Sequence, residues 1–340
     1  MAVTIKDVAA LAEVSPSTVS RTCKNHPSIS EETKEKVRRA MAQLGYEPSA
    51  PLRAPSQQPV HTVGIILPPS QKEVYENSFY LETIRGISQF CNHRQYISTI
   101  ITGQDTKELL QTIQRTACSN QADGFILLYS RRQDPIQEYL YGEGLLYVLI
   151  GKAYQYANQT IYIDNDNLLA GQEATEYLLN LGHKKIAYLG SDTSLMFCAD
   201  RKAGYQLALN ARQLPFRPEY CLELPSTPKD NPPALRAMLQ ADDRPTAIVV
   251  SDDILAVALE RVCMEIGLSI PEDLSIISFN NSLLARLTSP QLTSIDVNSF
   301  QLGIEAASQV INHMENPNLM ATKIIVPHHL VKRNSCKKMD

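Results

Sequence analysis

The first residues of the chain constrain its fold most strongly, because residues 3–21 have the pattern of two short helices joined by a tight turn. Thr4 and Asp7 have the spacing of a capping box, and Ser15 before Pro16 is typical of a second helix start. Between these two caps, apolar residues recur at helical spacing at Ile5, Val8, Ala9 and Ala12. We therefore predict two short helices on either side of the turn.

A third helix is predicted between Ser30 and Gly45, with a buried side formed by Val37, Ala40, Met41 and Leu44. Residues 1–47 would then form a small three-helix domain. In the second helix only Val19 is expected to be buried. Hydroxyl and guanidinium groups that can bind phosphates and base edges are left outward at Ser17, Thr18, Ser20 and Arg21. The alternative is three ordinary surface helices whose hydroxyl groups serve only as caps.

A different kind of sequence follows a polar stretch at residues 48–61, which contains four prolines and is typical of a linker. Short apolar runs, separated by helical stretches, indicate buried parallel strands at 63–67, 124–128 and 145–150. Further strands are predicted at 160–163, 186–189, 247–250, 275–279 and 324–326, with a late helix at about 299–315. We therefore predict an α/β core over residues 62–340, built as two doubly wound parallel-sheet lobes.

Charge and cysteine usage narrow the class of protein further. The net charge is −4, yet residues 1–60 carry a local excess of +2, so one copy is expected to bind DNA weakly and to act as a homodimer. The seven cysteines are scattered and form no C-x-x-C pair, which indicates reduced thiols and no zinc site. Because no apolar run has the length of a membrane span and no signal-peptide pattern is present, we expect no membrane association and a cytoplasmic location.

Candidate ligand contacts lie beyond the carboxyl ends of the predicted strands, where two facing lobes would share one cleft. Together with two aromatic residues of the first connection, the candidates are Phe79, Tyr80, Tyr129, Lys152, Asp164, Arg201, Asp252 and Asn280, with their neighbours Ser130, Asn165, Asp253 and Asn281. Aromatic rings can cover the apolar face of a pyranose, and the polar groups can satisfy its hydroxyls. For each polar residue, a helix cap or a structural ion pair is the alternative.

The N-terminal motifs resemble the headpiece of the lactose-repressor (LacI/GalR) family. The resemblance rests on V-T-I-x-D-V-A at residues 3–9, V-S-x-x-T-V-S-R at 14–21 and G-Y-x-P at 45–48. It implies a helix-turn-helix DNA-binding headpiece at 1–47, a hinge at 48–61, and a core similar to periplasmic sugar-binding proteins, whose chain passes between the lobes three times. The implied lobes are about 62–161 with 293–322, and about 162–290 with 323–340.

The resemblance also implies which residues of this chain contact DNA and the effector. It places DNA contacts at Thr4, Ser15, Ser17, Thr18, Ser20, Arg21, Lys24 and Asn25, and hinge contacts at Leu52, Arg53 and Pro55. Arg201 matches the family's effector arginine, and Asn280 stands where an aspartate is usual. Glu13 replaces the usual glycine of the turn, and Pro55 removes a hydrogen bond from the usual hinge helix.

Segments 77–80, 150–152, 164–166 and 278–282 most resemble the maltose-operon repressors of Gram-positive bacteria. The resemblance implies a regulator of palindromic double-stranded operator DNA, with maltose or a maltodextrin as effector and with no cofactor. Two alternatives stay open, a non-catalytic carbohydrate-binding protein and a glycoside-processing enzyme that uses paired acids such as Asp252 and Asp253. Against catalysis, adjacent carboxylates point apart, and motifs such as G-x-S-x-G and H-E-x-x-H are absent from the sequence. His328 and His329 would face opposite sides of a strand, so no metal site is expected.

Overall fold

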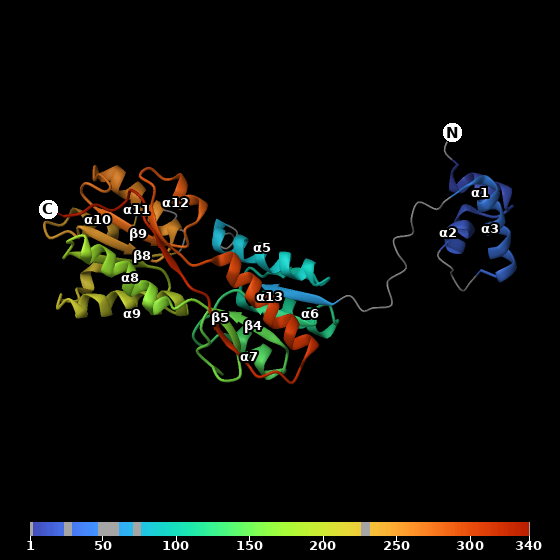
Figure 1. The fold of residues 1–340 in the computed structure, drawn as a ribbon, viewed down its shortest axis with the longest axis horizontal. Helices are drawn as coiled ribbons and strands as arrows, with labels where there is room; N and C mark the ends of the chain where they lie inside the picture. The colour runs from blue at the N-terminus through green and yellow to red at the C-terminus, as the bar shows by residue number, and fades with distance from the viewer. Residues whose placement is uncertain (1–2, 24–28, 47–60, 71–75, 226–231, 340) are drawn as a thin grey trace. The chain divides into compact units, whose positions relative to one another are not determined.

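Figure 1 shows the computed structural model of the chain, which describes residues 3–23, 29–46, 61–70, 76–225 and 232–339. At Lys6, Ser17, Ser20 and Arg21 it describes the backbone and not the side chain. The chain forms two compact units, residues 1–60 and residues 61–340, which are called the headpiece and the core below.

The headpiece is a three-helix domain within its described residues, with α1 (Ile5–Leu11), α2 (Pro16–Cys23) and α3 (Glu31–Leu44). The predicted cap of α1 is present, because the Asp7 carboxylate accepts hydrogen bonds from the backbone amide and the hydroxyl of Thr4 at 2.8 and 2.7 Å. One valine from each helix is fully buried where the helices meet, namely Val8, Val19 and Val37. Gly45 ends α3 at φ 60°, a left-handed conformation that glycine adopts without steric cost.

The N-lobe of the core is built on a parallel sheet of six strands in the order β11-β5-β4-β3-β1-β2. The strands are β1 (Thr62–Ile66), β2 (Ile97–Ile101), β3 (Gly124–Leu127), β4 (Tyr147–Ile150), β5 (Ile161–Asp164) and β11 (Lys323–Ile325). One face of the sheet forms a hydrophobic core with α5 (Ser78–His93) and α13 (Ser299–Glu315). The other face forms a second core with α6 (Thr106–Cys118) and α7 (Pro135–Gly142).

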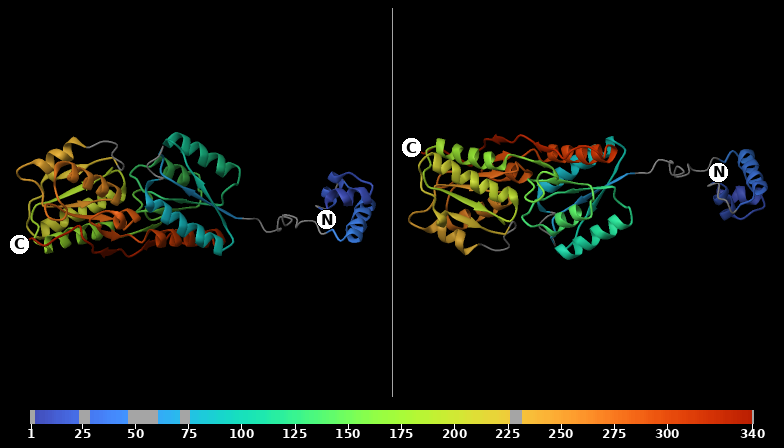
Figure 2. Two further views of the ribbon diagram at one scale, coloured as in Figure 1. Left: turned by 90° about the horizontal axis from the view of Figure 1, so that it is seen from above. Right: turned by 90° about the horizontal axis from the view of Figure 1, so that it is seen from below.

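The C-lobe repeats this plan with six strands in the order β12-β10-β9-β8-β6-β7. The strands are β6 (Ile186–Gly190), β7 (Cys221–Glu223), β8 (Ala247–Val250), β9 (Ser275–Phe279), β10 (Thr293–Asp296) and β12 (His329–Val331). Its helices are α8 (Asn167–Asn180), α9 (Met196–Ala211), α10 (Pro233–Gln240), α11 (Asp253–Ile266) and the short α12 (Leu283–Leu287). Strand β12 runs antiparallel to β10, so this sheet departs from the predicted parallel arrangement at one edge. Both views of Figure 2 show the two lobes side by side.

The chain crosses between the lobes three times, and each crossing lies later than the predicted boundary. Because β5 pairs in the N-lobe sheet, the first crossing follows residue 164 and not 161. Because β10 pairs in the C-lobe sheet and β11 in the N-lobe sheet, the other two follow residues 296 and 325. An apolar pattern marks a buried strand but not the sheet that the strand joins, which explains the displacement. The side-chain amide of Asn165 ties the crossings together by donating to the carbonyl oxygens of Val297 and Val326 at 3.0 and 2.8 Å.

Each lobe contains one pair of helices that approach each other through glycine. In the N-lobe, a Cβ atom at Gly303 of α13 would lie 2.1 Å from the carbonyl oxygen of Thr83 in α5. In the C-lobe, a Cβ atom at Gly204 of α9 would lie 2.1 Å from the carbonyl oxygen of Leu168 in α8. These contacts bring the two backbones close enough to exclude any side chain, and they anchor the helices that start beside the crossings.

Candidate functional site

The predicted DNA contacts of the headpiece gather around the start of α2. Ser15 caps this helix, because its hydroxyl accepts a hydrogen bond from the Thr18 amide at 3.1 Å, and the two hydroxyl oxygens are 2.9 Å apart. Glu13 takes the left-handed conformation (φ 53°) in the turn, and its carboxylate accepts from Lys36 Nζ at 3.2 Å. Ser17, Ser20 and Arg21 follow in α2, while Lys24, Asn25, Leu52, Arg53 and Pro55 lie outside the described residues.

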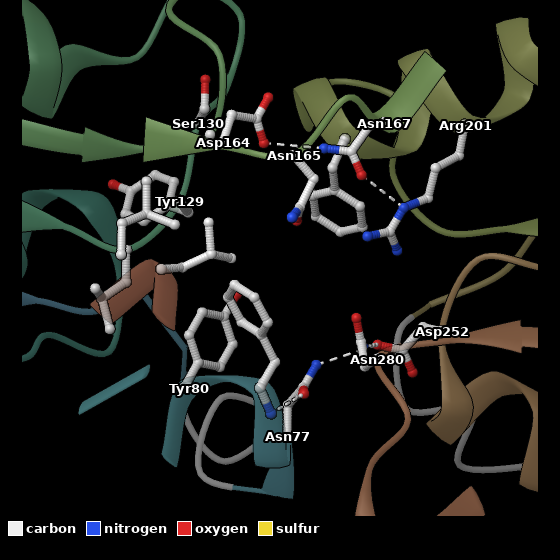
Figure 3. A pocket seen from close by; sticks show the side chains of 16 residues that line it. Asn77, Tyr80, Tyr129, Ser130, Asp164, Asn165, Asn167, Arg201, Asp252 and Asn280 are labelled. Carbon is white, nitrogen blue, oxygen red and sulfur yellow. Dashed lines mark hydrogen bonds between the residues drawn. The ribbon is translucent and has the colours of Figure 1, made fainter. Parts of the chain in front are cut away.

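Most of the predicted effector residues meet in one pocket between the two lobes of the core, which Figure 3 shows from close by. The lining residues are Asn77, Phe79, Tyr80, Leu128, Tyr129, Ser130, Ile150, Gly151, Asp164, Asn165, Asn167, Phe197, Arg201, Asp252, Asn280 and Leu302. Many of them follow the carboxyl ends of β3, β4, β5, β8 and β9 directly, where ligands of parallel α/β sheets bind. The enclosed space has a volume of about 60 Å³.

Arg201 is held on the C-lobe side of the pocket by contacts on two of its nitrogen atoms. Its Nε donates to the side-chain oxygen of Asn167 at 2.8 Å, and its Nη1 donates to the carbonyl oxygen of Ser251 at 2.7 Å. The guanidinium carbon lies 4.2 Å from the ring centroid of Phe279 and 4.9 Å from that of Phe197. The guanidinium plane is therefore fixed by both hydrogen bonds and ring stacking.

Asp252 joins the two lobes at the opposite corner of the pocket (Figure 3). Its Oδ1 caps α11 by accepting from two backbone amides at 2.6 and 3.4 Å. Asp252 is therefore both a helix cap and a lining residue of the pocket. Its Oδ2 accepts from the side-chain amides of Asn77, in the N-lobe, and Asn280, in the C-lobe, at 3.2 and 3.3 Å. Asn280 has a φ of 96°, which asparagine tolerates better than most residues. Burial raises the pKa of Asp252 to about 6, and the charge of Asp253 adds to this shift.

Asp164 ends β5 at the first crossing and belongs to a chain of polar contacts that reaches Arg201. The side-chain amide of Asn167 donates to Asp164 Oδ1 at 2.9 Å, while the oxygen of the same amide accepts from Arg201. Burial raises the pKa of Asp164 to about 7, the charge of Asp200 adds to the shift, and Arg201 opposes it. At neutral pH this carboxyl group can therefore donate a hydrogen bond as well as accept one.

Apolar groups from the N-lobe form the other wall. Phe79 and Tyr80 lie at the start of α5, with ring centroids 5.4 Å apart in an edge-to-face arrangement. Phe79 packs against the hydrophobic clusters of both lobes, and Tyr129 is buried beyond β3. The pocket thus places apolar rings opposite carboxyl, amide and guanidinium groups. Such a lining can hold an uncharged, hydroxyl-rich molecule with apolar faces.

Three of the sequence-based candidates lie outside the lining. Gly151 turns the chain after β4 with a φ of 107°, and the Lys152 ammonium pairs instead with Asp200 at 3.4 Å. The structure thus has Gly151, and not Lys152, in the lining, and Asp200 pairs with Lys152 and not with its neighbour Arg201. Asp253 is buried in the C-lobe, where it accepts from the Ser294 hydroxyl, whereas Asn281 is half-buried and donates to Asp296.

Sequence reasoning missed Asn77, Asn167 and Phe197 among the polar and aromatic lining residues. Phe197 lies one helical turn before Arg201, and this spacing could have identified it as a stacking partner. Asn77 caps α5 by accepting from the Phe79 amide at 2.9 Å. Its position before an aromatic pair could therefore have identified it as a lining residue.

Among the described residues of the chain, no group of three or more His, Cys, Asp and Glu side chains is placed to hold a metal ion. His328 instead lies 3.1 Å from Glu173, and His329 lies 3.9 Å from Asp296. The helices of the same residues include none that is long and apolar enough to span a bilayer.

Known proteins resemble both units of the chain. The family of bacterial regulatory proteins, lacI family, matches residues 4–49, and the periplasmic binding protein-like domain matches residues 175–336. The HTH-type transcriptional regulator MalR of Streptococcus pneumoniae is 32% identical over 346 residues, which cover 98% of this chain and 100% of the relative.

Solved structures extend this similarity to the fold. A transcriptional regulator of the LacI type from Bacillus cereus subsp. cytotoxis has a TM-score of 0.80 and 37% identity, and the match covers 83% of this chain and 100% of that one. The transcriptional regulator CelR, in a complex with cellobiose, has a TM-score of 0.76 and 25% identity over 98% of this chain and 100% of that one. The chain belongs to the lacI family of bacterial regulatory proteins. It is therefore a sequence-specific DNA-binding transcriptional regulator and not an enzyme.

Proposed function

We propose that the chain is a repressor whose affinity for its operator is set by maltose or a maltodextrin bound in the pocket between the lobes. The observation that carries this proposal is the division of the pocket into two walls. The ring of Tyr80 lies on one wall, opposite the hydrogen-bonding groups of Arg201, Asp252 and Asn280 (Figure 3). The ring of Phe79 lies beside that of Tyr80. Each sugar hydroxyl both donates and accepts, and a pyranose also has an apolar face, so this lining complements such a molecule.

The choice of a glucose disaccharide is supported by the relatives. MalR regulators of Streptococcus pneumoniae and Staphylococcus xylosus are each 32% identical to this chain over 98% of its length. The CelR structure, which shares the fold over nearly the whole chain, is a complex with cellobiose. Arg201 shares the lining with the carboxyl groups of Asp164 and Asp252, so the pocket has no excess of positive charge that would select an anionic sugar over a neutral one.

We further propose that two copies pair through their cores and that α2 of each headpiece reads one half of a palindromic operator in the cytoplasm. The proposed DNA contacts are Thr4, Ser15, Ser17, Thr18, Ser20, Arg21, Lys24 and Asn25, with the hinge residues Leu52, Arg53 and Pro55. Sugar binding alters the closure of the lobes and so the fit of the headpieces to the half-site spacing. By linkage, operator binding must then change sugar affinity by the same factor.

Exposed apolar side chains of the core support the pairing of two copies. The edge strand β2 exposes Ile97 and Ile100, while α11 and α12 expose 75% of Met264 and 71% of Leu287. An open strand edge and apolar side chains exposed to this degree can take part in association between copies. Light scattering should give the mass of a dimer for the wild type and of a monomer for Met264→Lys with Leu287→Lys. Met320→Lys, at a residue that is 85% exposed elsewhere on the N-lobe, is the matched control.

The effector is tested by titration calorimetry of the purified protein with maltose, maltotriose, cellobiose and ribose, followed by gel shifts on operator DNA with the same sugars. We expect maltose or maltotriose to bind and to weaken the operator complex. Absence of binding by both maltose and maltotriose would refute the effector, and binding without any effect on DNA affinity would refute the coupling.

The DNA-binding role of α2 is tested by Arg21→Ala. We expect this variant to lose operator binding while its sugar affinity stays unchanged, because the headpiece and the core are separate units. Arg39→Ala is the matched control, since Arg39 is an exposed arginine of α3 that pairs with Glu35. Equal loss of operator binding in both variants would show a general charge effect and would contradict the specific role of α2.

A further inference from the structure

The pocket between the lobes is closed to a ligand of the expected size. Its enclosed volume of about 60 Å³ is far below the roughly 300 Å³ at which ligand pockets begin. On the side of the crossings, Asn165 holds the chain segments together through two hydrogen bonds. A sugar can therefore reach the lining only if contacts between the lobes separate elsewhere.

One set of such contacts is a short antiparallel pairing between residues 130–132 of the N-lobe and residues 194–196 of the C-lobe, which we call the clasp. The Arg132 amide donates to the carbonyl oxygen of Ser194 at 2.9 Å, and the Met196 amide donates to that of Ser130 at 3.0 Å. Arg131 and Leu195 lie opposite each other between these two bonds. An ion pair of 3.4 Å between Arg131 and Asp192 lies beside the clasp.

The clasp separates two spaces. Ser130 lines the closed pocket, whereas Arg131 and Leu195 line an outer pocket of about 390 Å³. Besides these two residues, the outer pocket is lined by Asp192, Glu223, Leu224 and Pro225. Its carboxylates and guanidinium can hydrogen-bond a polyol, and the Nε of Arg131 is buried there without a partner.

We propose that the clasp is the gate through which the sugar passes from the outer pocket to the lining. This inference rests on the proposed function for the identity of the ligand. On the opposite side, one side-chain hydrogen bond of 3.2 Å joins Asn77 to Asp252 across the lobes, and Phe79 packs against the hydrophobic cores of both lobes. The clasp is polar, with two backbone hydrogen bonds and a partly exposed ion pair whose groups water can satisfy when the lobes part. Separating the lobes at Phe79 would instead expose apolar surface to water, so the clasp is the side that separates first.

The gate is tested by a reversible cross-link in the full chain, with Arg131→Cys and Leu195→Cys. Residues that face each other in a non-hydrogen-bonded antiparallel pair have the Cα separation that a disulfide needs. Cys118, which is exposed, is replaced by serine in this background to prevent links between copies. Stopped-flow measurements follow the association and dissociation of maltose, and non-reducing electrophoresis with mass spectrometry measures the cross-linked fraction.

We expect the oxidised variant to bind and release maltose at least about 100-fold more slowly than the reduced form, and reduction to restore both rates. Unchanged rates after complete cross-linking would overturn the gate. A second, milder variant is Asp192→Asn, which removes the ion pair and should speed association and dissociation together. Glu82→Gln is its control, because this change breaks the Arg85 ion pair outside the clasp and should leave both rates unchanged.

A ligand-free measurement separates this inference from the proposed function. If the wild type binds none of the sugars, the proposed function fails, and hydrogen exchange then tests the clasp alone. An opening gate requires the amides of Arg132 and Met196 to exchange together, faster than the Val148 amide in the central strand β4, and to be slowed by the cross-link. Exchange as slow as that of Val148, or unaffected by the cross-link, would overturn the gate.

Discussion

The two lobes of the core share a topology but present different chemistry to the pocket. Both sheets have six strands in corresponding order, and in each lobe one pair of helices meets through glycine. The N-lobe wall consists mostly of rings and aliphatic groups, namely Phe79, Tyr80, Leu128, Tyr129, Ile150 and Leu302, with the polar residues Asn77, Ser130, Asp164 and Asn165 at its margins with the C-lobe and the crossings. The C-lobe wall is more polar and consists of Asn167, Phe197, Arg201, Asp252 and Asn280. The strand framework thus determines where a side chain reaches the pocket, and the residue type determines what it does there.

The two walls therefore make different physical contributions to ligand binding, and a substitution can remove one contribution without the other. The N-lobe wall acts by burying apolar surface, which contributes roughly 25 cal/mol for each Å² removed from water. The C-lobe wall acts through buried hydrogen bonds to charged groups, each of which contributes about 1.5 to 3 kcal/mol. Because the C-lobe groups also satisfy one another, we expect substitutions there to cost more than substitutions in the N-lobe wall.

The largest effect is expected for Arg201→Ala in the C-lobe wall. The substitution leaves buried acceptors on Asn167 and Ser251 without their donor and removes the ring contact with Phe279. We expect the free energy of unfolding of the core to fall by about 3 to 5 kcal/mol, as when other buried charged partners are removed. Urea denaturation measures this change, and Arg201→Lys, which keeps the charge, should lose less. A variant as stable as the wild type would show that these contacts do not organise the C-lobe wall.

The next largest effect is a pH dependence of stability, which arises from Asp164 at the first crossing between the lobes. The pKa of Asp164 is about 7 in the folded core, above its ordinary value of 3.8, so the folded state binds this proton more tightly. The resulting stabilisation is fully present below about pH 4 and is lost as the pH rises through about 7. We expect the free energy of unfolding to fall by about 2 to 4 kcal/mol over this window.

Asp164→Asn is the control for this pH dependence, because it cannot titrate and its oxygen can still accept from Asn167. Denaturation curves at pH 4 and pH 8 should therefore differ less for the variant than for the wild type. The slope that remains is expected from Asp252 and Glu260, whose pKa values of about 6 and about 7 are raised in the same direction by burial. If the wild-type core instead gained stability relative to the variant between pH 4 and pH 8, the predicted direction of the pH dependence would be wrong.

A smaller effect tests whether the lobes share their packing as well as their topology. A Cβ atom at Gly204 or Gly303 would lie 2.1 Å from a carbonyl oxygen of the neighbouring helix. We expect Gly204→Ala and Gly303→Ala each to lower the free energy of unfolding by about 1 to 3 kcal/mol, the range for overpacking. Gly142→Ala is the control, since nothing lies within 4 Å of its Cβ position. Very unequal losses of unfolding free energy for the two variants would show that the lobes share their topology but not their helix packing.

The sequence predicts the central strands of both sheets because those strands are buried on both faces. The continuous apolar runs indicate β1, β3, β4, β8 and β9, and the structure contains all of them. It also contains β2, β7, β10 and β12, which were not predicted. Three of these are edge strands, and β10 has a single aliphatic residue in Thr-Ser-Ile-Asp, so none has a continuous apolar run. The lobe that β5 or β11 joins depends on pairing between distant residues, which local patterns do not encode.

The candidate pocket could be predicted where a residue directly follows a buried strand. This rule identifies Tyr129, Asp164, Asp252 and Asn280, all of which line the pocket. It misses Asn77, because the position of that residue becomes meaningful only when the facing lobe supplies Asp252. Lys152 follows a strand as well, yet the turn at the neighbouring Gly151 directs its side chain to Asp200. The path of the backbone after a strand ends is not encoded in the apolar pattern of the strand.

The smallest effect is expected in the N-lobe wall, for Phe79→Ala. This change removes apolar contact with both lobes but leaves the polar contacts of Asp252 in place. We expect sugar affinity, measured by calorimetry, to fall about five- to tenfold, or about 1 to 1.4 kcal/mol. Phe79→Leu keeps much of the apolar surface and should lose less. If Phe79→Ala instead weakens sugar binding as much as Arg201→Lys does, the rings contribute more than buried apolar area, and the two walls cannot be treated as separate contributions.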